Sequence, residues 1–181
     1  MENSKHIPRI RIHPKNPDLV YAAVMGDLYK PTKERGVYRS KNGGETWEKI
    51  LFANKNAGAV DLIQDPSDAN ILYAGIWERE RRGWNFVESG EGSGIYKSIN
   101  GGDNWELLSN ENSGFPTGEG VGRIGLSMYN DGNNSVIYAV LDNQFRREEE
   151  ANEEIKKGWQ KDDLKKISKD DFLNLTEQEM T

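Results

Sequence analysis

One stretch of the sequence, Trp77–Glu88, interleaves aromatic rings with guanidinium and carboxylate groups. Flat rings stack on sugar faces and charged groups orient hydroxyls, so this composition suits contact with a carbohydrate or a peptide. Arg79, Arg82 and Trp84 are its candidate ligand-binding residues. The alternative is that the rings pack inside the fold and the charges are solvated.

Carboxyl groups in and near this stretch could support catalysis. Glycoside hydrolysis normally uses two carboxyl groups about 5–9.5 Å apart. Asp61 is the candidate catalytic residue, and its possible partners are Glu78, Glu80, Glu88 and Glu91. No motif selects one pair, which counts against a self-contained catalyst.

These residues belong to a chain that repeats itself before Asn143. The segment 13–23 returns as 65–75, a shift of 52 residues, and the segment 36–47 returns as 94–105, a shift of 58 residues. A third, looser copy ends in Val136–Val140. The six extra residues of the second copy must therefore lie in the connector between its halves.

Each copy has the pattern of four short strands. Runs rich in Val, Ile, Tyr and Trp between Gly, Asn and Pro predict strands, and Asn-Gly-Gly predicts a tight hairpin between strands three and four. The expected first strands of the three copies are 10–13, 62–65 and 124–128, and the second strands end in Tyr-Ala at 21, 73 and 138. The expected third strands are 37–40 and 95–98, and the fourth strands begin at Trp47 and Trp105. Four antiparallel strands per unit, with a period of about 50 residues, predict propeller blades.

Aligning the apolar residues of the first strands places three charged residues at one position: Arg9, Asp61 and Arg123. In a propeller the first strands line the central channel, so these charges would ring its mouth. One interpretation is ion pairing between blades, which satisfies half-buried charge. The other is a mouth that recognises a carboxylate or a sugar, where an Arg supplies a donor fork and Asp61 accepts hydroxyls or acts as acid or base.

The two Asn-Gly-Gly hairpins carry a further motif. They resemble the Asp-box, or BNR repeat, of pattern Ser-x-Asp-x-Gly-x-Thr-Trp, through the residues Ser40, Asn42, Gly44 and Trp47, and Ser98, Asn100, Gly102 and Trp105. Asn in place of Asp keeps an oxygen acceptor and removes the charge. A structural role in holding the hairpin is therefore favoured over metal binding or chemistry.

Over residues 5–143 the chain is similar to bacterial sortilin-like propeller proteins, also called BNR-repeat glycosyl hydrolases, a family that is sialidase-like in its repeats. The resemblance implies a β-propeller and export to an extracellular or periplasmic location. The family is mixed in function, so enzyme activity stays open. If the chain belongs to an enzyme, the resemblance implies a glycoside hydrolase.

Composition changes near Asn143. Of the 19 Gly, 18 lie before it, and residues 144–181 are rich in Lys and Glu. This predicts two parts, blades over 1–143 and a charged helical or partly disordered insertion or tail over 144–181. Ser168 and Thr176 resemble helix starts in the second part.

Composition also excludes several classes of protein. Without Cys and with two His, the chain can have no disulfide framework, and neither a metal site nor a cofactor is expected. A net charge of -6 argues against a sequence-independent nucleic-acid binder. No stretch approaches the roughly 20 apolar residues that span a bilayer, and the chain shows no signal peptide.

The sequence thus predicts an all-β chain, a β-propeller fragment of about two and a half four-stranded antiparallel blades with a charged α-helical C-terminal excursion. Propellers close with roughly four to eight blades, so the expected partners are the remaining blades of a longer chain or another copy. The predicted function is a binding scaffold for a glycan or polypeptide on the connector-loop face. The alternative is part of an exported glycoside hydrolase whose active site other blades complete.

Overall fold

The computed structural model describes residues 1–132, 134–145 and 167–176, and it divides into two compact units, Met1–Phe145 and Arg146–Thr181. In the second unit the described part holds one helix, α2 (Lys169–Leu173). Ser168 begins it as predicted, because its side chain accepts a hydrogen bond from the backbone N–H of Asp171. The segment after the predicted start at Thr176, and most of the predicted excursion, lie outside the described residues.

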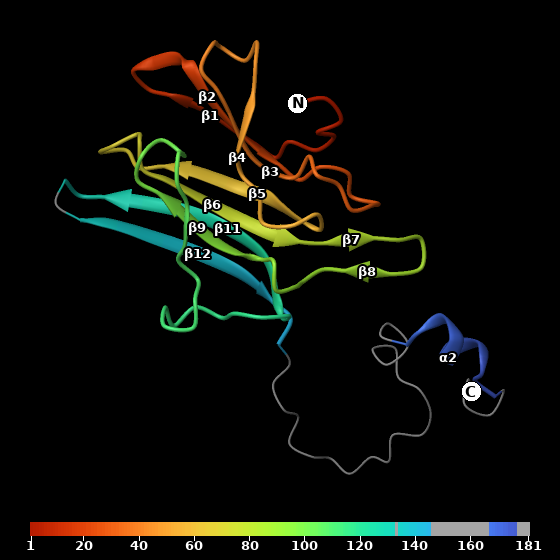
Figure 1. Cartoon of the computed structure of the whole chain (residues 1–181). Helices are drawn as coiled ribbons and strands as arrows, with labels where there is room; N and C mark the ends of the chain where they lie inside the picture. Colours follow the sequence, from red (N-terminus) through yellow and green to blue (C-terminus); the bar gives the residue numbers. More distant parts are fainter. Residues whose placement is uncertain (133, 146–166, 177–181) are drawn as a thin grey trace. The chain divides into compact units, whose positions relative to one another are not determined.

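The first unit is built from antiparallel strands, as predicted (Figure 1). Sheet one has the order β1 (Arg9–His13), β2 (Asn16–Val24), β3 (Gly36–Ser40), β4 (Glu48–Leu51). Sheet two has the order β5 (Ala57–Gln64), β6 (Leu72–Glu78), β9 (Gly94–Ser98), β10 (Glu106–Leu107). Two further pairs are β7 (Glu80–Arg81) with β8 (Phe86–Val87), and β11 (Val121–Asn130) with β12 (Ser135–Asn143).

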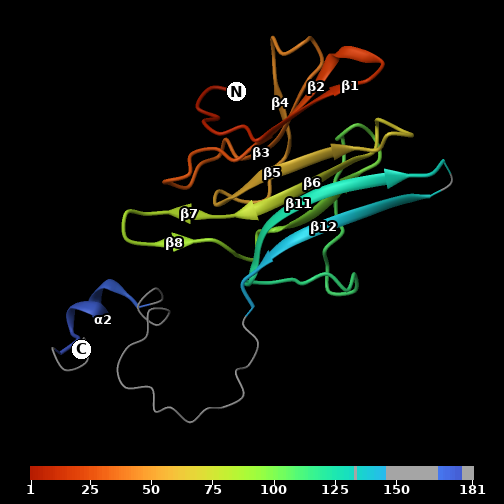
Figure 2. The same cartoon turned by 180° about the vertical axis from the view of Figure 1, so that it is seen from behind.

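Sheets one and two share one register. Tyr21 in β2 lies opposite Arg39 in β3, and Tyr73 in β6 lies opposite Lys97 in β9. The six extra residues of the second copy lie between β6 and β9, where the β7–β8 hairpin continues beyond the end of β6 (Figure 2). The repeat in the sequence is therefore a repeat of sheet geometry, with one insertion in the connector.

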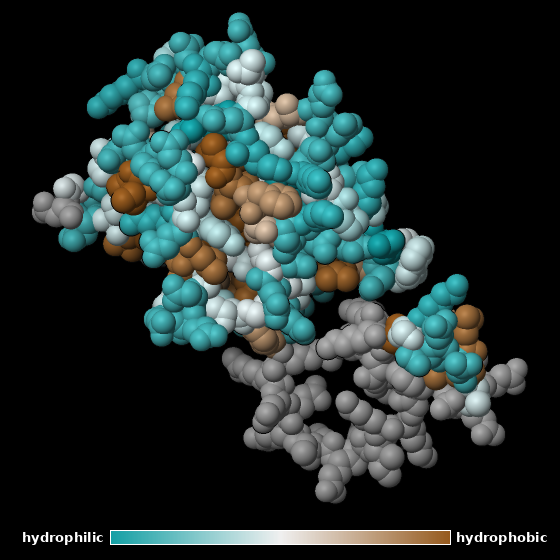
Figure 3. All heavy atoms as spheres, viewed as in Figure 1, coloured by the Kyte–Doolittle hydropathy of each residue, from teal (hydrophilic) through white to brown (hydrophobic). Residues whose placement is uncertain are grey.

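The main apolar core lies between sheets one and two. Because side chains alternate along a strand, one face of β2 meets β5 and β6 across this interface. Its buried residues are Tyr21, Ala23, Val37, Leu51, Ala57, Ala59, Leu62, Leu72, Ala74 and Ile76. A second core of Ile95, Val121 and Ile124 joins sheet two to the β11–β12 pair. Sheet two is thus covered on both faces, while the surface seen in Figure 3 is mainly hydrophilic with scattered apolar patches.

Each Ser-x-Asn-Gly-Gly hairpin is held by the same side-chain hydrogen bonds. In turn two (Ser98–Trp105), Ser98 Oγ accepts from the N–H of Gly102 at 2.9 Å and Asn100 Oδ1 accepts from the N–H of Asn104 at 3.0 Å. The indole of Trp105 donates to the Gly102 carbonyl at 3.1 Å. Turn one (Ser40–Trp47) repeats these bonds at 2.8, 2.9 and 2.8 Å through Ser40, Asn42 and Trp47.

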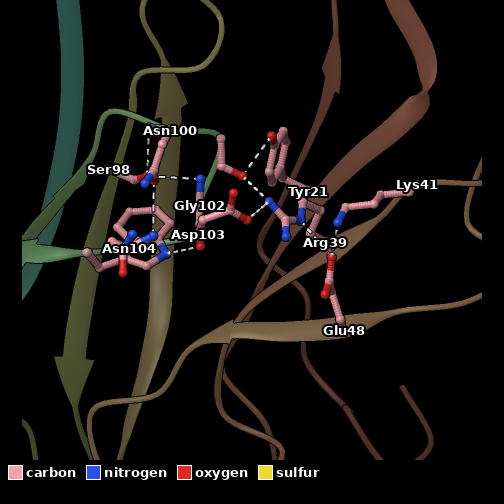
Figure 4. A network of polar contacts seen from close by, with 11 residues as sticks. Tyr21, Arg39, Lys41, Glu48, Ser98, Asn100, Gly102, Asp103 and Asn104 are labelled. Carbon is pink, nitrogen blue, oxygen red and sulfur yellow. Dashed lines mark hydrogen bonds and ion pairs between the residues drawn. The ribbon is translucent and has the colours of Figure 1, made fainter.

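Sheet one binds turn two directly (Figure 4). The hydroxyl of Tyr21 and Nη1 of Arg39 both donate to the carbonyl oxygen of Gly101, at 3.1 and 2.7 Å. Arg39 also pairs with Asp103 at 2.7 Å and with Glu48 at 2.8 Å, although its side chain is only 7% exposed. Turn two therefore holds its own hairpin and also joins the two sheets.

The position of each Trp yields a stability prediction. Trp105 packs against the core between the sheets, whereas Trp47 packs against a small cluster of sheet one and Met1. We expect Trp105→Ala to lower the free energy of unfolding by about 3–5 kcal/mol, and Trp47→Ala to lower it by less. Urea denaturation measures both. A larger loss for Trp47→Ala would contradict this assignment of the two rings.

Candidate functional site

Guanidinium groups and aromatic rings alternate at the connector end of sheet two. Arg79 lies over two rings, 4.9 Å from the centroid of Trp77 and 5.0 Å from that of Phe86. Arg81 lies 5.0 Å from the Phe86 centroid and Arg123 lies 5.9 Å from the Trp77 centroid. These five side chains, called the arginine–aromatic stack below, come from β6, the β7–β8 hairpin and β11.

The two rings of the stack belong to the interior of the fold. Trp77 is buried, and its indole N–H donates to the carbonyl of Glu88 at 2.7 Å. It packs edge to face against Phe86, with 6.5 Å between the ring centroids. Phe86 is partly buried against the same small cluster as Trp77. Of the two interpretations of the connector, internal packing holds for these rings, while Arg81 and Arg123 are exposed and Arg79 is half-buried.

Strand alternation separates the charges of the hairpin. Arg79 lies between β6 and β7, and Arg81 follows two residues later in β7, so along this extended backbone both side chains lie against Phe86. Glu80 and Arg82 take the opposite face, where they form an ion pair. Arg82 is therefore engaged within the hairpin and lies outside the stack.

A buried arginine fixes the backbone beneath the stack. Arg35 is fully buried, and its guanidinium donates to the carbonyls of Asp27 at 2.6 Å, of Arg79 at 3.1 Å and of Asn56. Burial lowers the pKa of Arg35, with the nearby Arg79 as a second cause. Three connectors, those before β3, before β5 and after β6, are thus joined by one side chain.

The stack carries positive charge that the described residues do not neutralise. Arg79, Arg81 and Arg123 form no ion pair within the described part of the chain, and Nε of Arg79 is buried without a hydrogen-bond partner. Burial and the positive charges of Arg81 and Arg123 lower the pKa of Arg79. Because a guanidinium offers a planar donor fork, a carboxylate would satisfy these groups.

The structure brings together only some of the predicted binding residues. Arg79 and Arg123 share the stack, whereas Trp84 lies between β7 and β8 with 86% of its surface exposed. Sequence reasoning missed Arg35 and Arg81. Arg81 could have been found from its two-residue spacing to Arg79 in a strand, but nothing in the sequence marks Arg35.

Asp61 belongs to a different cluster, between the first strands. Its side chain is 8% exposed, and Oδ1 accepts from Nε of Arg9 and the N–H of Leu62, both at 2.9 Å. Oδ2 accepts from the N–H of Leu126 in β11, also at 2.9 Å. Burial raises the pKa of Asp61, but these three bonds outweigh it and the pKa lies below its usual value. The ionised carboxylate therefore connects β1, β5 and β11.

Arg123 is not equivalent to Arg9 and Asp61, and the predicted alignment of the third copy is wrong by two residues. Arg9 and Asp61 each lie opposite the residue two positions after the tyrosine of the second strand. In the third pair Gly125 takes that position, opposite Val140. The prediction matched Ile124 to Ile10 and Leu62, whereas the strand pairing gives that place to Leu126, opposite Ala139; both residues are apolar, so apolar spacing alone does not distinguish them.

Two further properties of the described residues concern metal binding and membrane insertion. No group of three or more His, Asp or Glu side chains among residues 1–132, 134–145 and 167–176 could hold a metal ion. Within those same ranges, no helix has the length and apolar character needed to cross a membrane.

Comparisons with known proteins return solved structures only. No family model matches the sequence. No curated protein matches it either. An ancestral GH74 enzyme aligns over 76% of this chain and 19% of its own, with 23% identity and a TM-score of 0.43. A GH74 enzyme of Niastella koreensis aligns over 74% of this chain and 17% of its own, with 24% identity and a TM-score of 0.43. The chain thus spans less than a fifth of the length of these structures.

The Asp61 cluster predicts a pH-dependent stability. Asp61→Asn removes the charge that Arg9 and two N–H groups bind, so we expect a loss of about 1–3 kcal/mol of unfolding free energy at pH 7. Because the folded pKa lies below 3.8, the stabilisation is present above that value and is lost as the pH falls through the folded pKa. Wild type and variant should therefore converge in urea unfolding at a pH low enough to protonate Asp61 in the folded protein.

The exposed Asp18 offers a matched control, since Asp18→Asn should change the unfolding free energy little at either pH. An Asp61→Asn variant with wild-type stability at pH 7 would show that the cluster does not hold the strands together.

Proposed function

We propose that residues 1–143 form part of an Asp-box β-propeller that acts as a binding scaffold on its connector-loop face. The support for a propeller is internal. Sheets one and two repeat one strand order and one register, and β5 contacts both β1 and β11, so that the first strands are neighbours. Further sheets, from a longer chain or another copy, would complete the ring.

The observation that carries the binding function is the uncompensated positive charge of the arginine–aromatic stack. Three guanidinium groups gather within one stack of a chain whose net charge is -6. Such local charge attracts anions and orients them. The nearby hairpin also presents the exposed indole of Trp84, which is suited to stacking on a sugar face. Together these features favour a glycan that carries carboxylate groups, with an acidic polypeptide as the second candidate.

The carboxyl groups support binding rather than hydrolysis. Both oxygens of Asp61 accept hydrogen bonds, and its lowered pKa is unsuited to a general acid near neutral pH. Oε2 of Glu78 accepts from the N–H of Gly92 at 2.7 Å, and Glu80 pairs with Arg82. These groups serve the local structure of the connectors.

Binding of a uronic-acid oligosaccharide, with the matching neutral oligosaccharide as comparison, tests this function by calorimetry. We expect the acidic sugar to bind more tightly and its affinity to fall as salt rises. Arg79→Gln and Arg123→Gln should each weaken it about tenfold or more, since each removes a charged donor.

Arg11→Gln is the matched control, because Arg11 lies in β1 outside the stack. Equal affinity for all four proteins would contradict the proposed site. An acidic peptide that binds in place of the sugar, with the same dependence on Arg79, would identify a polypeptide ligand. Sugar turnover that Asp61→Asn abolishes would instead favour the glycoside hydrolase.

A further inference from the structure

A row of three residues, a tyrosine, a cation and a glutamate, crosses adjacent strands in both four-stranded sheets. In sheet one Tyr21 lies opposite Arg39, which lies opposite Glu48. In sheet two the corresponding row is Tyr73, Lys97 and Glu106. Each row offers a phenol hydroxyl and a cation side by side, with a carboxylate next to the cation. The two rows therefore present the same kinds of donor at the same place in the repeat.

The row in sheet one binds a turn of the next sheet. Tyr21 and Arg39 donate to one carbonyl oxygen, that of Gly101, and Arg39 pairs with Asp103 two residues later. Close contact is possible because residue 102 is glycine, where a Cβ would lie 2.4 Å from Cδ1 of Ile50. The row in sheet one thus recognises the carbonyl oxygen of a Gly-Gly turn and the acidic residue that follows the turn.

The row in sheet two has the donors in place without that acceptor. Tyr73 is 5% exposed, and Nζ of Lys97 lies 5.6 Å from the centroid of its ring. Across residues 1–132, 134–145 and 167–176, neither the Tyr73 hydroxyl nor the Lys97 ammonium takes part in a hydrogen bond or an ion pair. Packing therefore positions a donor pair that the described chain does not use.

The β11–β12 pair shows where the acceptor would come from. Sheets one and two continue from their second strand to a third strand and a turn, whereas β12 pairs with β11 alone among the described strands. Val140 on β12 is 77% exposed, and Val136 and Tyr138 are also exposed. A third strand added to β12 in the register of sheets one and two would carry its following turn to the row of sheet two.

We propose that Tyr73 and Lys97 bind a Gly-Gly turn of the Ser-x-Asn-Gly-Gly type, presented by a strand–turn–strand segment that pairs with β12. The hydroxyl and the ammonium donate to the carbonyl oxygen of its first glycine, and Lys97 pairs with the acidic residue after the second. This inference rests on the further sheet of the proposed function, but it is independent of the ligand.

A synthetic peptide with the sequence of residues 92–109 serves as the probe, because it copies the strand–turn–strand segment of sheet two. Titration of the labelled peptide into the whole chain, followed by fluorescence anisotropy, should show saturable binding. Tyr73→Phe should weaken it about fivefold and Lys97→Met about tenfold, from the loss of a neutral and a charged donor. Tyr29→Phe is the matched control and should leave the affinity unchanged, because Tyr29 is exposed in the connector between β2 and β3, away from β12 and the row of sheet two.

A change in the peptide keeps the test independent of the folding of the protein variants. Asp103→Asn in the peptide should weaken binding to the wild-type protein and have no added effect on Lys97→Met, because the two changes remove one ion pair. Additive losses, or affinities that ignore Tyr73 and Lys97, would overturn the proposal. Absence of peptide binding would overturn it as well. Self-association of the chain that prevents peptide binding and is unchanged by Tyr73→Phe would also overturn it. Retained binding of the acidic sugar by Tyr73→Phe would separate this result from the proposed function.

Discussion

The buried carboxylate of Asp61 constrains how sheet one, sheet two and the β11–β12 pair meet. Burying a charge costs several kcal/mol unless donors replace the lost water. Asp61 obtains them from Arg9 in β1, from the N–H of Leu62 in its own strand and from the N–H of Leu126 in β11. The first strands therefore cannot slide past one another without leaving an ionised group unsatisfied. The relative positions of residues farther along these strands depend on this register.

One such consequence is the arginine–aromatic stack. By the shift of 52 residues Trp77 is equivalent to Met25, and both are buried in one small cluster. Sheet one has a short connector at this point, whereas sheet two inserts the β7–β8 hairpin, which adds Arg79, Arg81 and Phe86. Arg123 reaches the Trp77 ring because β11 is held beside β5. The candidate site thus arises where the second copy departs from the repeat.

Local patterns predicted most of the fold, and contacts between distant segments account for what they missed. Strand positions and both turns follow from alternation, Gly-Gly and Trp, which act over a few residues. The Arg9–Asp61 pair followed from the repeat and is present at 2.9 Å. Arg123 was misaligned because Ile124 and Leu126 are both apolar and lie two residues apart, so composition does not show which of them pairs as Ile10 and Leu62 do. The stack was only partly foreseen, since its members come from β6, the hairpin and β11, and no sequence pattern predicts which rings lie between which guanidinium groups.

The asparagine of turn two fits the charge balance of the interface between the sheets. Where the motif pattern has Asp, turn two has Asn100, whose oxygen still accepts the N–H of Asn104. The one cation bound to this turn, Arg39, already faces two carboxylates, Glu48 and Asp103. Asn100 is exposed, so a carboxylate at position 100 would stay solvated, but it would add a further negative charge to a turn whose one bound cation already has two carboxylate partners. An amide supplies the acceptor that the turn requires and keeps the interface close to neutral, which allows the turn to hold its own hairpin and to bind the neighbouring sheet.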